Sequence, residues 1–226
     1  MDSKLIARAV LLAPSYIIQH LKAGFYKTYD YMLGVIRHSV QSVYNGWMGG
    51  EFVDILQSLI FGQMTQAYQQ AWEDDGNTSL FLPDFLQNAL AENIARNTNF
   101  DYLYQYYTDI IDARVDGTPI EPLLARASLW ANRYTEAYNE ANTIIASYTG
   151  GKMIWQLGAT EQHCDTCGAL HGIVAYANEW RALGVAPQQA PNSALSCGGW
   201  RCDCQLTATN ERKTRNAVSR IQSAIN

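Results

Sequence analysis

The chain is poor in charged residues and has no long apolar segment. Only 16% of its 226 residues are Asp, Glu, Lys or Arg, against about a quarter in an average globular protein. We therefore expect a partner to cover part of the surface.

The most apolar later stretch, residues 52–62, contains Asp54 and Gln57 and is far shorter than a membrane span of about 20 residues. Arg8 interrupts the first apolar run, which argues against a signal peptide. We expect a soluble, intracellular protein with no membrane segment of its own.

Basic charge is missing from the middle of the chain. Residues 49–147 hold four basic and fourteen acidic side chains, whereas residues 1–48 hold five basic and two acidic ones. Residues 211–226 are again basic, with four basic side chains and one acidic. A dedicated binder of duplex DNA needs a basic face that displaces counterions. Contact with DNA is therefore expected only at the two basic termini.

The motifs of several common catalysts are also absent. The chain contains no His-Glu-x-x-His, no phosphate-binding glycine loop and no His-x-Glu ahead of a Pro-Cys-x-x-Cys pair. A Cys–His hydrolase is disfavoured because no single thiol can be singled out as the nucleophile. A zinc-stapled nuclease or nucleic-acid-binding protein stays as the alternative. The residues available for a second, catalytic metal are His163, His171, Asp165 and Asn192, although not in the order typical of His-Asn-His nucleases. We predict no enzymatic activity.

Residues 2–147 have the apolar periodicity of helices. Apolar side chains recur at steps of three and four, which places them along one helical face. Glycine, proline and short polar clusters separate the segments. The predicted helices cover residues 2–12, 15–44, 51–73, 83–94, 102–113 and 121–147.

The pattern changes after Gly151. Short β-like runs occupy residues 152–157, 172–176 and 204–209, a brief helix is expected at 178–184, and a weak amphipathic helix lies in the tail. The predicted fold class is a mainly α N-terminal helical region with a small α+β, zinc-stapled C-terminal module. The predicted parts are a helical arm or bundle (1–147), the module (148–209) and a basic helical tail (210–226).

All five cysteines lie between residues 164 and 204, in the pattern C-x2-C, twenty-nine residues, C-x4-C-x-C. Two groups of close-set thiols are what a tetrahedral zinc ion needs to join two turns of chain. We expect one structural Zn²⁺ bound by Cys164, Cys167 and two of the other three, with Gly168 in the tight turn. A histidine, His163 or His171, could replace one thiol, and reduced core thiols or a reactive disulfide are the alternatives to a metal. The candidate metal ligands are Cys164, Cys167, Cys197, Cys202 and Cys204.

Two motifs in this region resemble a known family. W-x-L-G-A-T-E-x-x-C-x-x-C-x-x-L-x-G runs from Trp155 to Gly172, and C-G-G-W-R-C-D-C-x-L occupies residues 197–206. Together with ANRYTEAYNEANT at residues 131–143, they resemble the C-terminal module of Mu F-like phage head morphogenesis proteins, the minor head (minor capsid) proteins of tailed phages. The likeness covers about residues 125–208. It departs from the family in having Cys197 where many members have a histidine, and Asp203 between the last two cysteines.

The resemblance implies a non-enzymatic structural protein of the virion. Such a protein would lie in the phage head interior or portal region, and in the host cytoplasm during assembly. It would bind the portal protein, the major capsid protein or both, and support head morphogenesis or DNA delivery. Its basic termini would contact packaged DNA.

Overall fold

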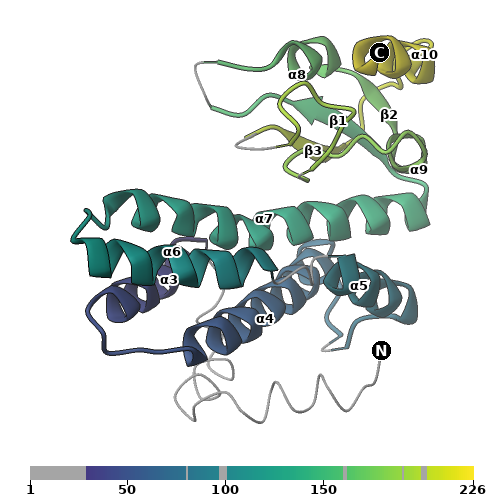
Figure 1. The fold of residues 1–226 in the computed structure, drawn as a ribbon. Helices are drawn as coiled ribbons and strands as arrows, with labels where there is room; N and C mark the ends of the chain where they lie inside the picture. Colours follow the sequence, from purple (N-terminus) through teal and green to yellow (C-terminus); the bar gives the residue numbers. More distant parts are fainter. Residues whose placement is uncertain (1–28, 80, 97–100, 160–161, 190, 200–202) are drawn as a thin grey trace. The chain divides into compact units, whose positions relative to one another are not determined.

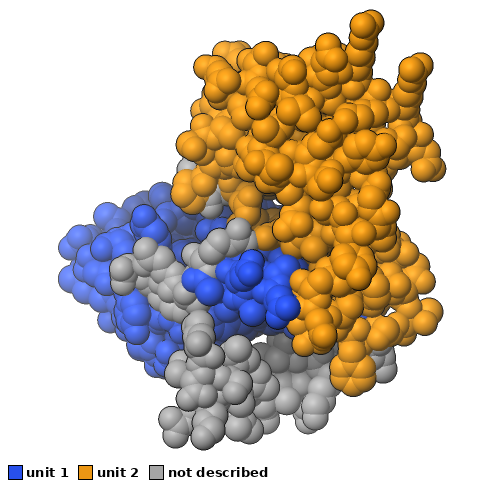
Figure 2. All heavy atoms as spheres, turned by 90° about the vertical axis from the view of Figure 1, so that its right-hand side faces the viewer, with its two compact units in different colours: residues 1–70, 88–135 blue, residues 71–87, 136–226 orange. Residues whose placement is uncertain are grey.

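The computed structural model describes residues 29–79, 81–96, 101–159, 162–189, 191–199 and 203–226. This part of the chain is mainly helical with a small three-stranded antiparallel sheet (Figure 1). It divides into two compact units (Figure 2): residues 1–70 with 88–135, and residues 71–87 with 136–226. The helices α4, α5 and α7 contribute to both units. The three-part division expected from composition stays a prediction.

The helices of the first unit follow the predicted ranges closely. They are α3 (Tyr29–Tyr44), α4 (Glu51–Asp74), α5 (Asp84–Arg96), α6 (Asp101–Asp116) and α7 (Glu121–Thr149). The predicted helix at 2–12 and the first half of the one at 15–44 lie outside the described residues. In α3, the predicted inward residues Met32, Ile36, Val40 and Val43 are all fully buried. The three-and-four spacing therefore identified the packing face of this helix correctly.

Polar side chains inside the first unit pair with backbone carbonyls or with other side chains. The Gln63 amide donates to the Trp130 carbonyl over 2.8 Å. The Tyr106 hydroxyl donates to the Leu123 carbonyl over 2.6 Å, and burial raises the pKa of this phenol. The Arg126 guanidinium pairs with Asp109 and lies 4.8 Å above the Tyr106 ring. These contacts fix α7 against α4 and α6 within the unit, because unpaired buried polar groups are costly.

The sheet belongs to the second unit and has the order β2-β1-β3. Its strands are β1 (Lys152–Gln156), β2 (Val174–Tyr176) and β3 (Gln205–Thr209), close to the predicted runs. Met153 pairs with Ala175 on one side and Ala208 on the other. Alternate residues of β1 face the core, so Met153 and Trp155 are buried while their neighbours are more exposed.

Three short helices complete this unit: α8 (Asp165–Leu170), α9 (Ala177–Ala182) and α10 (Ala217–Ile225). Trp155 of β1 and Trp180 of α9 pack with ring centroids 5.8 Å apart, and the Trp180 indole donates to the Met153 carbonyl over 3.3 Å. Ala217 and Ile221 of α10 join the same core. The predicted brief helix and tail helix are present, whereas α8 was not predicted.

Candidate metal centre

The first cysteine pair lies on α8. Cys164 is the N-cap of this helix, with extended backbone angles (φ −71°, ψ 156°), and its Sγ accepts a hydrogen bond from the Cys167 N–H over 3.4 Å. The Cys164 carbonyl accepts from the Gly168 N–H over 3.0 Å. A single helical turn thus brings both thiols to one end of α8, because residues three apart lie on the same side of a helix.

Gly168 does not have the role expected for it. It lies within α8, and a Cβ at this position would meet nothing within 4 Å. The left-handed turns are made instead by Gly172 (φ 74°) after the helix, and by Gly198 and Gly199 (φ 64° and 78°) beside the next cysteine. A side chain at those three positions would be strained, since L-residues rarely adopt positive φ.

Asn192 organises the loop that carries Cys197. Its side-chain amide donates to the carbonyls of Gly184 (3.2 Å) and Ala186 (3.3 Å), and its side-chain oxygen accepts from the Ala194 N–H over 3.0 Å. The Asn192 N–H donates to the Gly198 carbonyl over 2.9 Å. These bonds close the loop and hold Cys197 in place.

Two hydroxyl groups join this loop to α8. The side-chain oxygens of Thr166 and Ser196 lie 2.5 Å apart. The Thr166 N–H donates to the Ser196 hydroxyl over 3.3 Å, and the Ser196 N–H donates to the Thr166 hydroxyl over 3.2 Å. Thr166 directly precedes Cys167, and Ser196 directly precedes Cys197. These reciprocal hydrogen bonds therefore connect the two halves of the cysteine pattern.

The result is a compact group of three sulfurs. The Sγ atoms of Cys164, Cys167 and Cys197 all lie within 4.8 Å of one another. Thiolates bound to one tetrahedral zinc at 2.3 Å would be separated by about 3.8 Å. The three sulfurs therefore occupy three corners of a site that could hold a metal ion. Cys167 is buried and the other two thiols are half-buried.

The remaining two predicted ligands are Cys202 and Cys204. Cys204 is 2% exposed and belongs to the hydrophobic core beside β3, but it is not a member of the group of three. Cys202 lies outside the described residues. None of the four described cysteines forms a disulfide. Sequence spacing thus identified three thiols that meet, and the fourth ligand stays a prediction.

The environment of Cys164 favours its thiolate. Burial by itself raises the pKa of this thiol, but hydrogen bonds from the backbone and side chains of Cys167 and Cys197 outweigh burial, and the pKa lies below its ordinary value. Metals bind thiolate rather than thiol, so a lowered pKa makes the group a better ligand at neutral pH.

The candidate histidines do not join the group of three among the described residues. His171 is the C-cap of α8, and its Nδ1 accepts a hydrogen bond from the Leu157 N–H over 3.4 Å. His163 directly precedes Cys164 and has contacts of its own. Asp165, proposed for the alternative nuclease site, starts α8, and Asn192 is engaged in closing its loop.

Gly158 is a structural residue that the sequence reasoning did not identify. A Cβ at this position would lie 2.3 Å from the Asp203 Cβ and 2.4 Å from the Asp203 carbonyl oxygen. Real side chains never come so close, so only glycine lets the segment after β1 run against Asp203. This contact holds Asp203 beside the end of β1, the strand that precedes the first cysteine pair. A glycine directly after a predicted strand was the available signal.

Comparison of the chain with protein-family models, with curated proteins and with solved structures found no match. Within the described residues, no helix is both long enough and apolar enough to cross a membrane.

Proposed function

We propose that the cysteine cluster is a structural zinc centre that holds together the C-terminal module. The observation that carries the proposal is the approach of three sulfurs, from α8 and from the loop before β3, to within 4.8 Å of one another. Hydrogen bonds between Thr166 and Ser196 support the same pairing of loops without any metal. An all-sulfur donor set is typical of structural zinc, and such a site leaves no open position for substrate.

The fourth ligand in this proposal is Cys202 or Cys204. Both flank Asp203, whose backbone packs against Gly158. A metal at this place would connect α8, the loop of Cys197 and the start of β3. Three segments that are far apart in sequence would then be joined at one point, which offsets the small size of the module's hydrophobic core.

We further propose that the protein is a non-enzymatic assembly component of a tailed-phage head, located at the portal or inner capsid surface. The resemblance of residues 155–172 and 197–206 to Mu F-like head morphogenesis proteins supports this role. The partners would be the portal protein, the major capsid protein or both, and the basic termini would face packaged DNA. A rigid zinc-stapled module and an aromatic helical region suit binding by surface complementarity.

Exposed aromatic side chains support a partner-binding role. Trp47 and Tyr102 in the first unit are 76% and 70% exposed, and Phe81 and Tyr148 in the second are 80% and 72% exposed. Aromatic residues are enriched at protein interfaces, where the ring is buried and the polar tip keeps a hydrogen bond. Such residues are the first choice for substitutions that would weaken a partner contact.

The test of the assembly role is co-purification from infected cells. The tagged chain should be recovered with a portal ring in a fixed ratio, and Trp47→Ala or Tyr148→Ala should reduce the recovered portal several-fold without changing the circular dichroism spectrum. Recovery of the chain without any portal protein would contradict the role. So would normal head assembly in infected cells that lack the chain. The zinc centre is tested separately by elemental analysis, for which one zinc per chain is expected.

A further inference from the structure

The C-terminal segment carries arginines whose charge is not matched inside the protein. Residues 204–226 contain one acidic residue, Glu211, against four basic ones. Lys213 is matched, because its ammonium group pairs with Glu179 and lies 5.0 Å from the Tyr176 ring. The remaining three are exposed, and their side chains make no ion pair or hydrogen bond within the described part of the chain: Arg212, Arg215 and Arg220.

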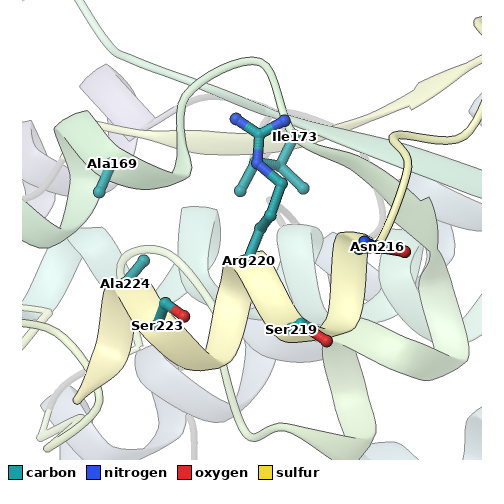
Figure 3. Close-up of a pocket in the computed structure, with 7 residues that line it drawn as sticks. All are labelled: Ala169, Ile173, Asn216, Ser219, Arg220, Ser223 and Ala224. Carbon is teal, nitrogen blue, oxygen red and sulfur yellow. The ribbon is translucent and has the colours of Figure 1, made fainter.

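Arg220 also lines a surface pocket of about 380 Å³ between α8 and α10. Figure 3 shows its guanidinium group above α10, next to Ile173, with Ser219 and Ser223 on the same helix and Asn216 at its start. Ala169 and Ile173 supply an apolar part of the wall. The lining contains no carboxylate, so nothing in it repels an anion.

The polar groups of the pocket fit a phosphate ester. A guanidinium donates two parallel hydrogen bonds to phosphate oxygens, and hydroxyl and amide groups donate single ones. Arginine, serine and asparagine are among the side chains that contact the phosphates and sugars of nucleic acids. The apolar wall suits the carbon face of a sugar. A nucleic-acid backbone presents such a sugar beside each phosphate, whereas an acidic side chain presents a carboxylate without one. Two further positive charges lie near the pocket in sequence. Arg215 directly precedes the pocket residue Asn216, and Arg212 lies three residues before Arg215.

We propose that this surface binds the sugar–phosphate backbone of a nucleic acid, with Arg220 holding one phosphate at the pocket and Arg212 and Arg215 contacting neighbouring phosphates. The proposed function expects contact with DNA at the basic termini, and this proposal names the arginines that make it. It rests on the proposed function only in taking the nucleic acid to be packaged DNA. Binding here does not require the portal, so this proposal and the proposed assembly role can fail independently.

The test is salt-dependent binding of a fluorescently labelled 20-base-pair duplex to the 226-residue chain. Anisotropy titrations between 50 and 200 mM NaCl give the slope of log K against log[salt], which is about −0.9 for each phosphate neutralised. The triple variant Arg212→Gln, Arg215→Gln, Arg220→Gln should have a slope smaller in magnitude by about 2.7. Over this range of salt, wild-type affinity should therefore fall about 40-fold more than that of the variant.

The matched control is Arg114→Gln, an exposed arginine on α6 that should leave the slope unchanged. Poly-glutamate serves as a competitor that offers carboxylates in place of phosphates, and unlabelled duplex should compete far better. Equal slopes for wild type and triple variant would overturn the proposal. So would the absence of duplex binding at 50 mM NaCl, or equal competition by poly-glutamate, which would indicate an acidic protein surface as the partner.

Discussion

The backbone N–H of Cys167 donates a hydrogen bond to the Sγ of Cys164 over 3.4 Å. The same cysteine side chain thus caps α8 and faces the sulfurs of Cys167 and Cys197. One orientation of Cys164 thus caps the helix and places its sulfur beside the other two, so folding of α8 prepares the candidate site.

The first prediction concerns Cys164 itself. Cys164→Ser should lose bound zinc and loosen the C-terminal module, because three sulfurs cannot hold the ion as tightly as four. Serine can still cap the helix, and the helices of the first unit lie elsewhere, so far-UV circular dichroism should change little. Near-UV dichroism should decrease, since Trp155 and Trp180 pack in the module core. Equal zinc content in wild type and variant would rule out a metal at this cluster.

A second prediction identifies the fourth ligand. Only one of the variants Cys202→Ser and Cys204→Ser should lose zinc, and the other should retain one zinc per chain. Cys204 is almost fully buried, so its replacement should lower the free energy of unfolding even if zinc is retained, because a buried hydroxyl replaces an apolar thiol. Loss of zinc in both variants, or in neither, would contradict a four-sulfur site.

Gly158 and Gly168 form a matched pair for the third prediction. Gly158→Ala should lower the free energy of unfolding by about 1–3 kcal/mol, because the added methyl group overlaps Asp203. Gly168→Ala adds the same group in open space within a helix, so it should be neutral or stabilise by up to about 1 kcal/mol. Urea titrations followed by tryptophan fluorescence measure both. Equal effects at the two positions would mean that the segment before β3 does not pack against Gly158.

The fourth prediction tests the link between Thr166 and Ser196. In a double-mutant cycle of Thr166→Val and Ser196→Ala, the coupling energy should be about 1 kcal/mol, since their bonds are lost together. Zinc affinity should fall in both single variants, because the two loops would no longer be held side by side. A coupling energy near zero would show that the loops are joined by other means.

The fifth prediction uses the Asp109–Arg126 pair. Burial raises the pKa of Asp109, but hydrogen bonds from Arg126 and Gln105 and the charge of Arg126 outweigh it, so the pKa is lowered. A carboxyl whose pKa is lower in the folded state stabilises the protein above its unfolded pKa, and this is lost as the pH falls through the folded value. Asp109→Asn should therefore be less stable than wild type at pH 7 by up to about 1 kcal/mol. The difference should begin to shrink below about pH 4 and be lost as the pH falls through the folded pKa, which lies lower.

The free energy of unfolding of both proteins, measured by urea titration from pH 3 to pH 7, tests this. Asp112→Asn on the same helix is the control, because Asp112 is exposed and its replacement should leave the pH dependence unchanged. A gap between wild type and Asp109→Asn that does not shrink between pH 5 and pH 3 would show that the asparagine acts through packing rather than charge.

Local patterns predicted the elements of this protein well. The helices α4, α6 and α7 lie within three residues of their predicted ends, because glycine and polar turns interrupt a clear apolar repeat. The strands were recognised from β-branched and aromatic runs between turns. The helix α8 was missed because six residues are too few for a periodic pattern, and because its N-cap is a cysteine rather than one of the usual capping residues.

The sequence by itself determined that the thiols come in two close-set groups, that the chain is mainly helical, and that the sheet lies in its C-terminal part. These features depend on residues a few positions apart. Tertiary structure alone decided that Cys197 meets the first pair, that Thr166 binds Ser196, and that Asp203 requires glycine at position 158. Such contacts join segments 30 or more residues apart, and they follow from how loops close over a common core, which local propensity does not encode.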